Sequence, residues 1–287
     1  MAISRKTFIR QSAFGAASVL LSNLPSQLLA ADKKIKHLGL ITGVLRKELK
    51  EDWKATLRKV SSIGYKYIEF ESFGTGNQEE EKRFLKDIGL KPLGGGTAMA
   101  QLKTDDSVKQ LVEKALFWDK KYLTCYWPWM DSGKNKKLDD FKKAAADLNR
   151  VGEICNKEGI RFAYHNHDNE FVPVEGYKWG YEVIMKETDP KAVAGLMDLY
   201  WVTKGGGDPV ELFKKFPGRF ELFHVKDMDR SPQKLYTCPG YGQLDFKKIF
   251  SHSKEAGVKY YIVEIDETPN PLKCVEDSYA YLKALRF

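Results

Sequence analysis

The chain has no apolar run long enough to cross a membrane. It contains 287 residues, and the apolar stretch near its start, residues 13–21, is far shorter than the roughly 18–20 residues that a spanning helix needs. We therefore expect no stable insertion into a membrane. An apolar content of 43% and a charged content of 30% are instead typical of a globular protein.

Cysteine is scarce as well. The chain has four cysteines, which are widely spaced, and no two of them form a Cys-x-x-Cys pair. This spacing argues against a zinc finger and indicates no disulfide framework. Three of the four fall in or beside predicted helices or strands, where free cysteine is usually a small buried apolar residue. The four residues are Cys125, Cys155, Cys238 and Cys274.

Two further absences narrow the class of protein. The formal net charge is +8, but lysine and glutamate are interspersed along the predicted helices and form no long basic block. This pattern favours a solvated surface, so we expect no nucleic-acid partner. The first predicted strand is also not followed by a Gly-x-Gly-x-x-Gly turn, which argues against an open, doubly wound dinucleotide-binding sheet.

The N-terminus has the pattern of an export signal. A basic segment, residues 4–10, precedes the short apolar stretch, and small residues at Ala30 and Ala31 offer a cleavage site. The basic segment resembles a twin-arginine signal in which Lys6 replaces the second arginine. An ordinary secretory signal and an unprocessed amphipathic tail are the alternatives. We expect a signal peptide over residues 1–30 and an exported, periplasmic protein.

After residue 34, short apolar strands alternate with amphipathic helices. The predicted strands cover residues 37–42, 67–70, 92–98, 122–126, 160–163, 193–198, 220–225 and 260–264. The predicted helices cover residues 53–63, 79–88, 107–118, 138–157, 179–188, a segment from Asp208, 245–256 and 275–285. Eight strand–helix units predict an α/β fold in which parallel strands close into one (β/α)8 barrel over residues 35–287.

The most informative segment is residues 163–171, which follows the fifth predicted strand and holds two of the five histidines. Because side chains alternate along a strand, His165 and His167 should point to the same side. Two imidazoles with carboxylates just beyond them suit a divalent metal or a proton-transfer site. A structural pair of hydrogen-bonded histidines is the alternative.

Polar side chains also follow the other strands, at the end of the barrel where such folds carry their chemistry. They are Glu69, Glu71, Asp198, His224, Lys226, Glu264 and Asp266. Any one of them could be a salt-bridged strand end. Burying them together without a cation is costly, so we expect a divalent metal among His, Asp, His and Glu side chains. Mixed nitrogen and oxygen ligands suit manganese, zinc, cobalt or iron.

These motifs resemble the xylose isomerase-like barrel superfamily, which includes sugar phosphate isomerases and epimerases and the endonuclease IV-like group. The motifs that carry the resemblance lie at residues 63–69, 164–167, 197–201, 223–227, 240–246 and 262–266. The resemblance extends from about residue 35 to the end of the chain.

The resemblance implies four metal ligands from strands five to eight, typically Glu, Asp, His and Glu. Asp198, His224 and Glu264 match the last three, whereas His165 stands where the family commonly has glutamate. The usual pair of acid/base glutamates is therefore incomplete. Either His165 binds the metal and Glu264 acts alone, or His167 or Glu170 supplies the second proton carrier.

The chemistry that the resemblance implies is proton abstraction beside a sugar carbonyl held by the metal, through an enediolate. Lys226 could hold a substrate oxygen or developing negative charge, and a salt bridge to Glu264 is its structural alternative. Glu69, in the second strand's motif, is a further candidate for substrate binding. Trp127, Trp129 and Trp201 could form an apolar wall for a sugar ring, although large aromatic residues more often pack in a core.

The leading hypothesis is thus a divalent-metal-dependent isomerase or epimerase of a sugar or keto-sugar. A lyase or hydratase acting on 3-keto-sugars or 3-keto-glycosides is the second, because His165 departs from the family pattern. Export favours unphosphorylated sugars as substrates. A DNA-repair nuclease is disfavoured, since no histidine lies between His37 and His165. A non-catalytic sugar-binding barrel is the remaining alternative. A homo-oligomer is compatible with the sequence, but no residue pattern fixes one.

Overall fold

The computed structural model describes residues 33–129 and 136–287. The predicted signal peptide, residues 1–30, lies outside this part of the chain. Within the described residues, no helix is both long enough and apolar enough to cross a membrane.

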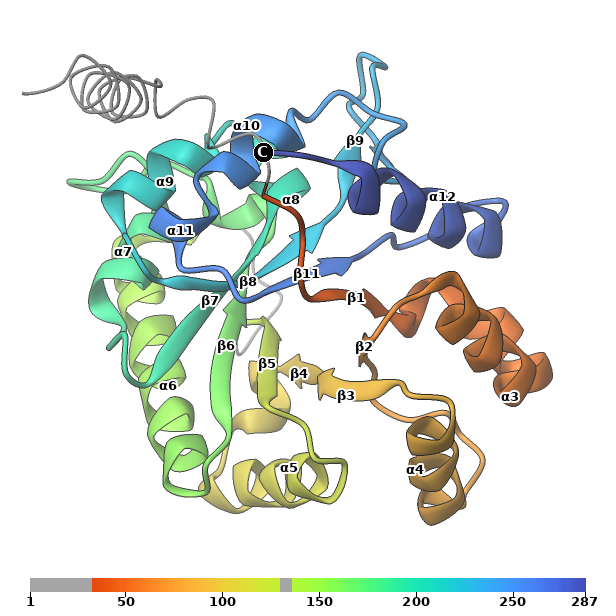
Figure 1. Cartoon of the computed structure of the whole chain (residues 1–287). Coiled ribbons are helices and arrows are strands. Elements are labelled where there is room, and N and C mark those ends of the chain that lie inside the picture. Colours follow the sequence, from red (N-terminus) through yellow and green to blue (C-terminus); the bar gives the residue numbers. More distant parts are fainter. Residues whose placement is uncertain (1–32, 130–135) are drawn as a thin grey trace, which may run out of the picture.

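The described residues form one sheet of nine parallel strands that curves into a nearly closed barrel, with helices around the outside (Figure 1). The strands follow one another in the order β3-β2-β1-β11-β8-β7-β6-β5-β4. Their bounds are β1 (Leu38–Ile41), β2 (Tyr67–Glu69), β3 (Lys91–Gly94), β4 (Gly96–Ala98), β5 (Tyr122–Trp127), β6 (Arg161–His165), β7 (Val193–Asp198), β8 (Phe220–Val225) and β11 (Tyr260–Val263). The predicted α/β barrel architecture is confirmed.

The third stave of the barrel is divided into two strands. β3 pairs with β2, β4 pairs with β5, and Gly95 separates the two halves. Gly95 has a φ of +151°, which side chains rarely allow, and an ideal Cβ on it would lie 2.1 Å from the carbonyl oxygen of Phe70. The single strand predicted over residues 92–98 is therefore two short strands on either side of a glycine kink. Counted together, these two strands take one strand position, which gives the barrel eight positions in all.

The helices agree with the sequence pattern in most places. Their bounds are α3 (Arg46–Ile63), α4 (Gln78–Asp87), α5 (Asp105–Phe117), α6 (Leu138–Lys157), α7 (Gly180–Glu187), α8 (Leu199–Lys204), α9 (Pro209–Lys215), α10 (Phe246–Ser251), α11 (Ser253–Ala256) and α12 (Pro271–Ala284). Short 3-10 turns η1 (Thr42–Leu45), η2 (Met99–Leu102) and η3 (Asp168–Glu170) follow β1, β4 and β6. An antiparallel pair, β9 (Asp227–Met228) and β10 (Tyr236–Thr237), follows β8.

Differences from the predicted helices have local causes. α3 begins at Arg46 but has extended φ/ψ at Asp52, whose carboxylate accepts a hydrogen bond from Ala55. The regular helix therefore restarts at Trp53, where the sequence predicted a beginning. α8 was not predicted, and Asp198 caps its first turn. The helix predicted over residues 245–256 is two short helices that meet at His252.

The alternation of side chains along the strands gives the barrel interior two layers. The lower layer is apolar and includes Leu93, Ala163, Leu196, Leu222 and Ile262. Two residues further along each of several strands, toward their carboxyl ends, the inward positions become polar. Ala163 is followed in this way by His165, Leu196 by Asp198, Leu222 by His224 and Ile262 by Glu264. Because inward side chains recur every two residues, one polar layer lies directly above a packed apolar layer.

Two of the cysteines depart from the sequence interpretation. Cys238 and Cys274 form a disulfide; they are 36 positions apart in the sequence, and their Cα atoms are 5.7 Å apart. The expectation of no disulfide was wrong, because the pair is brought together by the fold, through the loop before α10 and the first turn of α12. Cys125 and Cys155 are free and buried, as expected for small apolar residues.

The divided third stave predicts a stability effect at Gly96. An ideal Cβ there would lie 1.8 Å from the carbonyl oxygen of Thr124 on the neighbouring strand, so Gly96→Ala must push β4 away from β5. We expect a loss of about 1–3 kcal/mol in the free energy of unfolding, measured by urea denaturation. Gly43→Ala is the matched control, since a Cβ there meets nothing within 4 Å. Equal stabilities for the two variants would contradict this account.

Candidate metal and active site

Four side chains from four adjacent staves meet at the carboxyl end of the barrel. His165 ends β6, Asp198 ends β7, His224 lies on β8, and Glu264 directly follows β11. Each offers one ligand atom, and these atoms lie within 4.8 Å of one another. The structure therefore brings together all four residues predicted as metal ligands. Three of them are buried, and Glu264 is partly exposed.

The hydrogen bonding of the four residues leaves room for a cation. Each has one buried side-chain atom without a hydrogen-bond partner: His165 Nδ1, Asp198 Oδ2, His224 Nδ1 and Glu264 Oε2. Buried polar atoms are normally paired, because leaving one unpaired costs free energy. Two imidazole nitrogens and two carboxylate oxygens with free lone pairs fit a transition metal or zinc better than calcium. The donor set thus fits the divalent ion expected from the sequence.

His224 is held in one orientation by Glu69. Its Nε2 lies 2.8 Å from Glu69 Oε2, and both side chains are fully buried. Nε2 is held by this carboxylate, and Nδ1 is directed to the cluster, where it faces Glu264 Oε2. Burial acts to lower the pKa of His224, but the Glu264 and Glu69 carboxylates outweigh it and raise the pKa to about 10.

Asp198 is fixed by backbone and side-chain contacts on both sides. Its Oδ1 accepts a hydrogen bond from the backbone N–H of Trp201 at 2.8 Å, as the cap of α8. Its own N–H donates to Asn166 Oδ1 at 3.1 Å, and Asn166 Nδ2 donates to its carbonyl at 3.5 Å. Burial raises the pKa of Asp198 to about 7, against the lowering influence of Lys226. Only Oδ2 is left to face the cluster.

Lys226 is a fully buried cation beside the cluster. Its Nζ lies 3.4 Å from Asp198 Oδ2, 3.4 Å from Glu264 Oε1 and 3.0 Å from Asp266 Oδ2. Burial acts to lower the pKa of Lys226, but Glu264, Asp198 and Asp266 together raise it, so the ammonium keeps its charge. The salt bridge to Glu264 considered as its structural role is present. The same position leaves the ammonium next to any substrate oxygen that the cluster binds.

His167 stands at the edge of the cluster between two aromatic rings. Its ring centroid is 4.8 Å from that of His165, 5.6 Å from Trp127 and 5.5 Å from Trp201. Its Nδ1 has no hydrogen-bond partner, and burial lowers its pKa, so the imidazole is neutral near pH 7. The predicted proton carrier and two of the three predicted wall residues therefore lie together. Trp129 instead packs in the core, against Phe141.

Glu170 lies below His167 and is fully buried. Its Oε1 accepts from the Tyr164 hydroxyl at 3.0 Å and its Oε2 from the backbone N–H of His167 at 3.0 Å. Burial raises the pKa of Glu170 to about 8. Both oxygens are thus used to hold the turn that carries His167. Its predicted part in proton transfer stays a prediction.

The structure adds three residues that sequence reasoning did not select. Asn166 clamps Asp198, as described above. Tyr126 is the third inward position of β5, with its ring 5.6 Å from His165 and 6.4 Å from His224. Asp227 accepts hydrogen bonds from the backbone N–H groups of Met228, Gly240, Gly242 and Leu244. The alternation in β5 could have revealed Tyr126, whereas the other two act through contacts distant in sequence.

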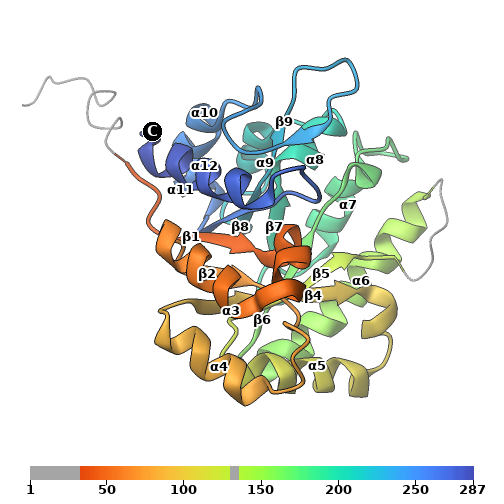
Figure 2. The same cartoon turned by 90° about the vertical axis from the view of Figure 1, so that its right-hand side faces the viewer.

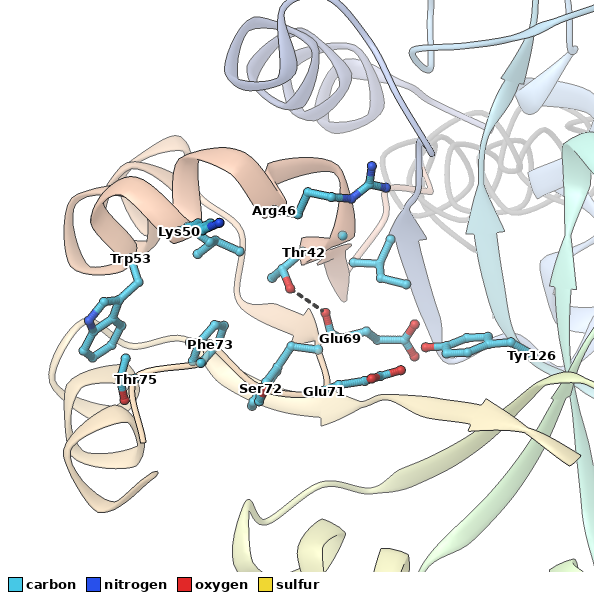
Figure 3. Close-up of a pocket in the computed structure, with 15 residues that line it drawn as sticks. Thr42, Arg46, Lys50, Trp53, Glu69, Glu71, Ser72, Phe73, Thr75 and Tyr126 are labelled. Atoms are coloured by element: carbon cyan, nitrogen blue, oxygen red, sulfur yellow. Dashed lines mark hydrogen bonds between the residues drawn. The ribbon is translucent and has the colours of Figure 1, made fainter. Parts of the chain in front are cut away.

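A large cavity opens beside this cluster (Figure 3). Its volume is about 790 Å³, and it lies between η1, α3 and the loop after β2. Glu69 and Tyr126 belong to both the cavity wall and the surroundings of His224. Glu69, predicted to bind substrate, therefore lines the cavity while it orients His224. Glu69 and Tyr126 are therefore the side chains through which the cavity borders the cluster, since none of the four ligand residues lines it.

The buried Glu170 predicts a pH effect on stability. A carboxyl group whose pKa is raised by folding stabilises the protein below about pH 4 and loses that contribution as pH rises toward about 8. Glutamine can accept from His167 N–H and donate to the Tyr164 oxygen without ionising. We expect Glu170→Gln to gain about 1–3 kcal/mol in stability relative to the native chain between about pH 5 and 9, measured by urea denaturation.

Glu153→Gln, an exposed substitution on α6, is the control for simple loss of a carboxylate. A pH-independent difference between the native chain and Glu170→Gln would contradict the assignment of a neutral, buried Glu170.

Comparison with known proteins places this geometry in context. An inosose dehydratase of Lacticaseibacillus casei is 25% identical over 227 residues, which cover 72% of this chain and 71% of that protein. A solved sugar phosphate isomerase/epimerase from Parabacteroides distasonis superposes with a TM-score of 0.74, at 28% identity, over 88% of this chain and 95% of that one.

Two more distant structures share the fold. The IolI protein, solved with a bound zinc atom, superposes with a TM-score of 0.65 at 18% identity, over 86% of this chain and 95% of that one. The 3-keto-D-glucoside 4-epimerase of E. coli superposes with a TM-score of 0.66 at 17% identity, over 87% and 99% of the two chains. The family model described as xylose isomerase-like TIM barrel matches residues 57–285. The chain belongs to the xylose isomerase-like TIM barrel family.

Proposed function

We propose that the protein is a divalent-metal-dependent carbon–oxygen lyase that acts on an unphosphorylated keto-sugar. The observation that carries this choice is the asymmetry of the mouth. Beside the four clustered ligands stands His167, whose Nδ1 has no hydrogen-bond partner, while His165 occupies the place of one of the two flanking glutamates expected for an epimerase and Glu264 remains as the other. The similarity to inosose dehydratases supports the same reaction class.

The metal would be held by His165, Asp198, His224 and Glu264, whose free donor atoms fit it. A divalent ion bound there supplies Lewis acidity to substrate oxygens. Its identity among manganese, zinc, cobalt and iron stays open. Glu69 fixes the ring of His224 through Nε2, and Asn166 keeps Asp198 aimed at the cluster.

The chain's own residues then have distinct tasks. His167 can take the proton from the carbon beside the ketone, because its lowered pKa keeps the imidazole neutral at the edge of the cluster. Lys226 keeps its charge and can stabilise the negative oxygen that develops. The protonated His167 can return its proton to the departing oxygen. Elimination on one face of the ring therefore needs one proton carrier.

An isomerase or epimerase is the second candidate. The Parabacteroides distasonis structure named as such an enzyme is 28% identical to this chain, and the E. coli 3-keto-D-glucoside 4-epimerase shares the fold. Epimerisation needs a second proton carrier on the other face of the reacting carbon. Glu264, which retains an oxygen toward Lys226, is the candidate for that role.

Export is part of the proposal. The disulfide between Cys238 and Cys274 supports an oxidising compartment, since structural disulfides are rare in the reducing cytosol. The periplasm, which the N-terminal sequence predicts, is such a compartment. Sugar phosphates are scarce there, which favours unphosphorylated substrates.

The proposed function predicts the metal content of the protein. We expect about one equivalent of a transition metal per chain by elemental analysis, and its loss in Asp198→Ala, because this change removes a buried ligand and its charge. Asp208→Ala is the matched control: Asp208 caps α9 as Asp198 caps α8, but it is not among the cluster residues. Metal loss from both variants, or from neither, would contradict the ligand assignment.

The proposed function also predicts the product formed from the substrate. With a 3-keto-glucoside we expect an unsaturated ketone, detected by its near-ultraviolet absorbance, and a fall of at least about 100-fold in kcat for His167→Gln. His252→Gln, a partly exposed histidine outside the site, is the control and should keep full activity.

Two other results would decide for the alternatives. If the reaction in D₂O gives a product whose mass differs from that of the substrate only by incorporated deuterium, and no unsaturated ketone forms, the enzyme is an epimerase. Sugar binding without turnover or metal dependence, and unchanged in Glu264→Gln, would identify the non-catalytic sugar-binding barrel.

A further inference from the structure

The cavity beside the cluster is larger than the reaction itself requires. Its volume of about 790 Å³ is at the upper end of the range for small-molecule sites, and a single hexose ring would leave most of it empty. It extends outward from the barrel mouth instead of upward from the four ligands. Its walls come from η1, α3 and the loop between β2 and α4.

The two ends of the cavity differ in chemistry. Figure 3 shows Tyr126 and Glu69 at the inner end and Trp53 and Thr75 at the outer end. The inner end borders the cluster, because Glu69 lines it and Glu69 Oε2 lies 2.8 Å from His224 Nε2. The outer end is aromatic: Trp53 is partly exposed and lies parallel to Phe73, with ring centroids 6.1 Å apart.

The rim carries positive charge between these ends. Arg46 lies 3.2 Å from Glu267 and donates a hydrogen bond to the backbone oxygen of Asp266, so it ties α3 to the loop after β11. Lys50, one turn further along α3, is exposed at the cavity. Polar groups at the rim and aromatic rings at the far end suit a ring that has both hydroxyl groups and apolar faces.

We propose that this cavity is an aglycone subsite, so that the natural substrate is a keto-glycoside whose leaving group carries a ring, and not a free keto-sugar. This inference rests on the lyase function proposed above. The keto-sugar ring occupies the cluster at Tyr126 and Glu69, and the leaving group extends toward Trp53.

The reaction balances without any further reagent. The carbon that lies between the ketone and the anomeric carbon loses its hydrogen: this carbon–hydrogen bond breaks, and the proton goes to His167. The electron pair forms a carbon–carbon double bond as the bond from the anomeric carbon to the glycosidic oxygen breaks. The proton from His167 then goes to that oxygen, so the aglycone leaves as an alcohol and the sugar remains as an unsaturated ketone.

The test compares two probes, the methyl and the benzyl 3-keto-β-glucosides, with the metal-loaded native protein, because their two alcohols are leaving groups of similar acidity. We expect kcat/KM to be at least 10-fold higher for the benzyl glycoside. Gly43→Phe should reduce this ratio to near one, because Gly43 lines the cavity and a side chain there meets nothing within 4 Å. Ala55→Phe adds the same ring on the exposed side of α3 and should leave the ratio unchanged.

A binding measurement separates this inference from the proposed function. The shift in Tm caused by each probe is recorded for the native chain, Gly43→Phe and Trp53→Ala. A larger shift with the benzyl probe, abolished in both variants, supports the subsite even if neither probe is turned over, which would refute only the lyase. Turnover of both probes with equal kcat/KM, or an equal loss for both in Gly43→Phe, would overturn the subsite and leave the lyase standing.

Discussion

Lys226 is held among three carboxylates at the mouth of the barrel, and the arrangement of the site depends on this buried charge. Asp198, Glu264 and Asp266 each lie within 3.4 Å of its Nζ. Removing one partner of a buried ion pair costs about 3–5 kcal/mol, because the other charge is left without compensation. Lys226 thus holds the two acidic ligands in place before any metal arrives. Its Nζ contacts Asp198 Oδ2 as an ion pair at 3.4 Å and not as a hydrogen bond.

The supporting contacts share one feature: each binds one polar side-chain atom of a ligand residue and leaves the residue's second polar atom directed to the cluster. Glu69 takes His224 Nε2, and the α8 backbone takes Asp198 Oδ1. These contacts, and not the ligand side chains alone, fix the orientation of the His224 ring and the direction of the Asp198 carboxylate. Such outer contacts orient the donors and tune their basicity. The site is therefore preorganised by groups that a substrate does not touch.

Periodicity made much of this predictable from sequence. The period of two along β6, β7 and β8 puts His165, Asp198 and His224 on the inner face, and the eight strand–helix units predict a barrel. What the sequence could not reveal depends on distant contacts. The Cys238–Cys274 disulfide, the clamp of Asn166 on Asp198 and the four backbone donors to Asp227 all join segments whose approach follows only from the completed fold. The kink at Gly95 replaces one predicted strand by two because its backbone conformation excludes a regular strand.

The order of the staves has an evolutionary consequence. The ligand-bearing strands β6, β7, β8 and β11 are consecutive, and each is flanked on both sides by parallel neighbours. The seam between β3 and β4 lies on the opposite side of the barrel, next to β2 and to the elements that wall the large cavity. Insertions and substitutions near the seam can change the shape of the cavity while the ligand strands keep their register. The barrel thus separates the four strands that carry the ligands from the half whose loops and helices wall the cavity.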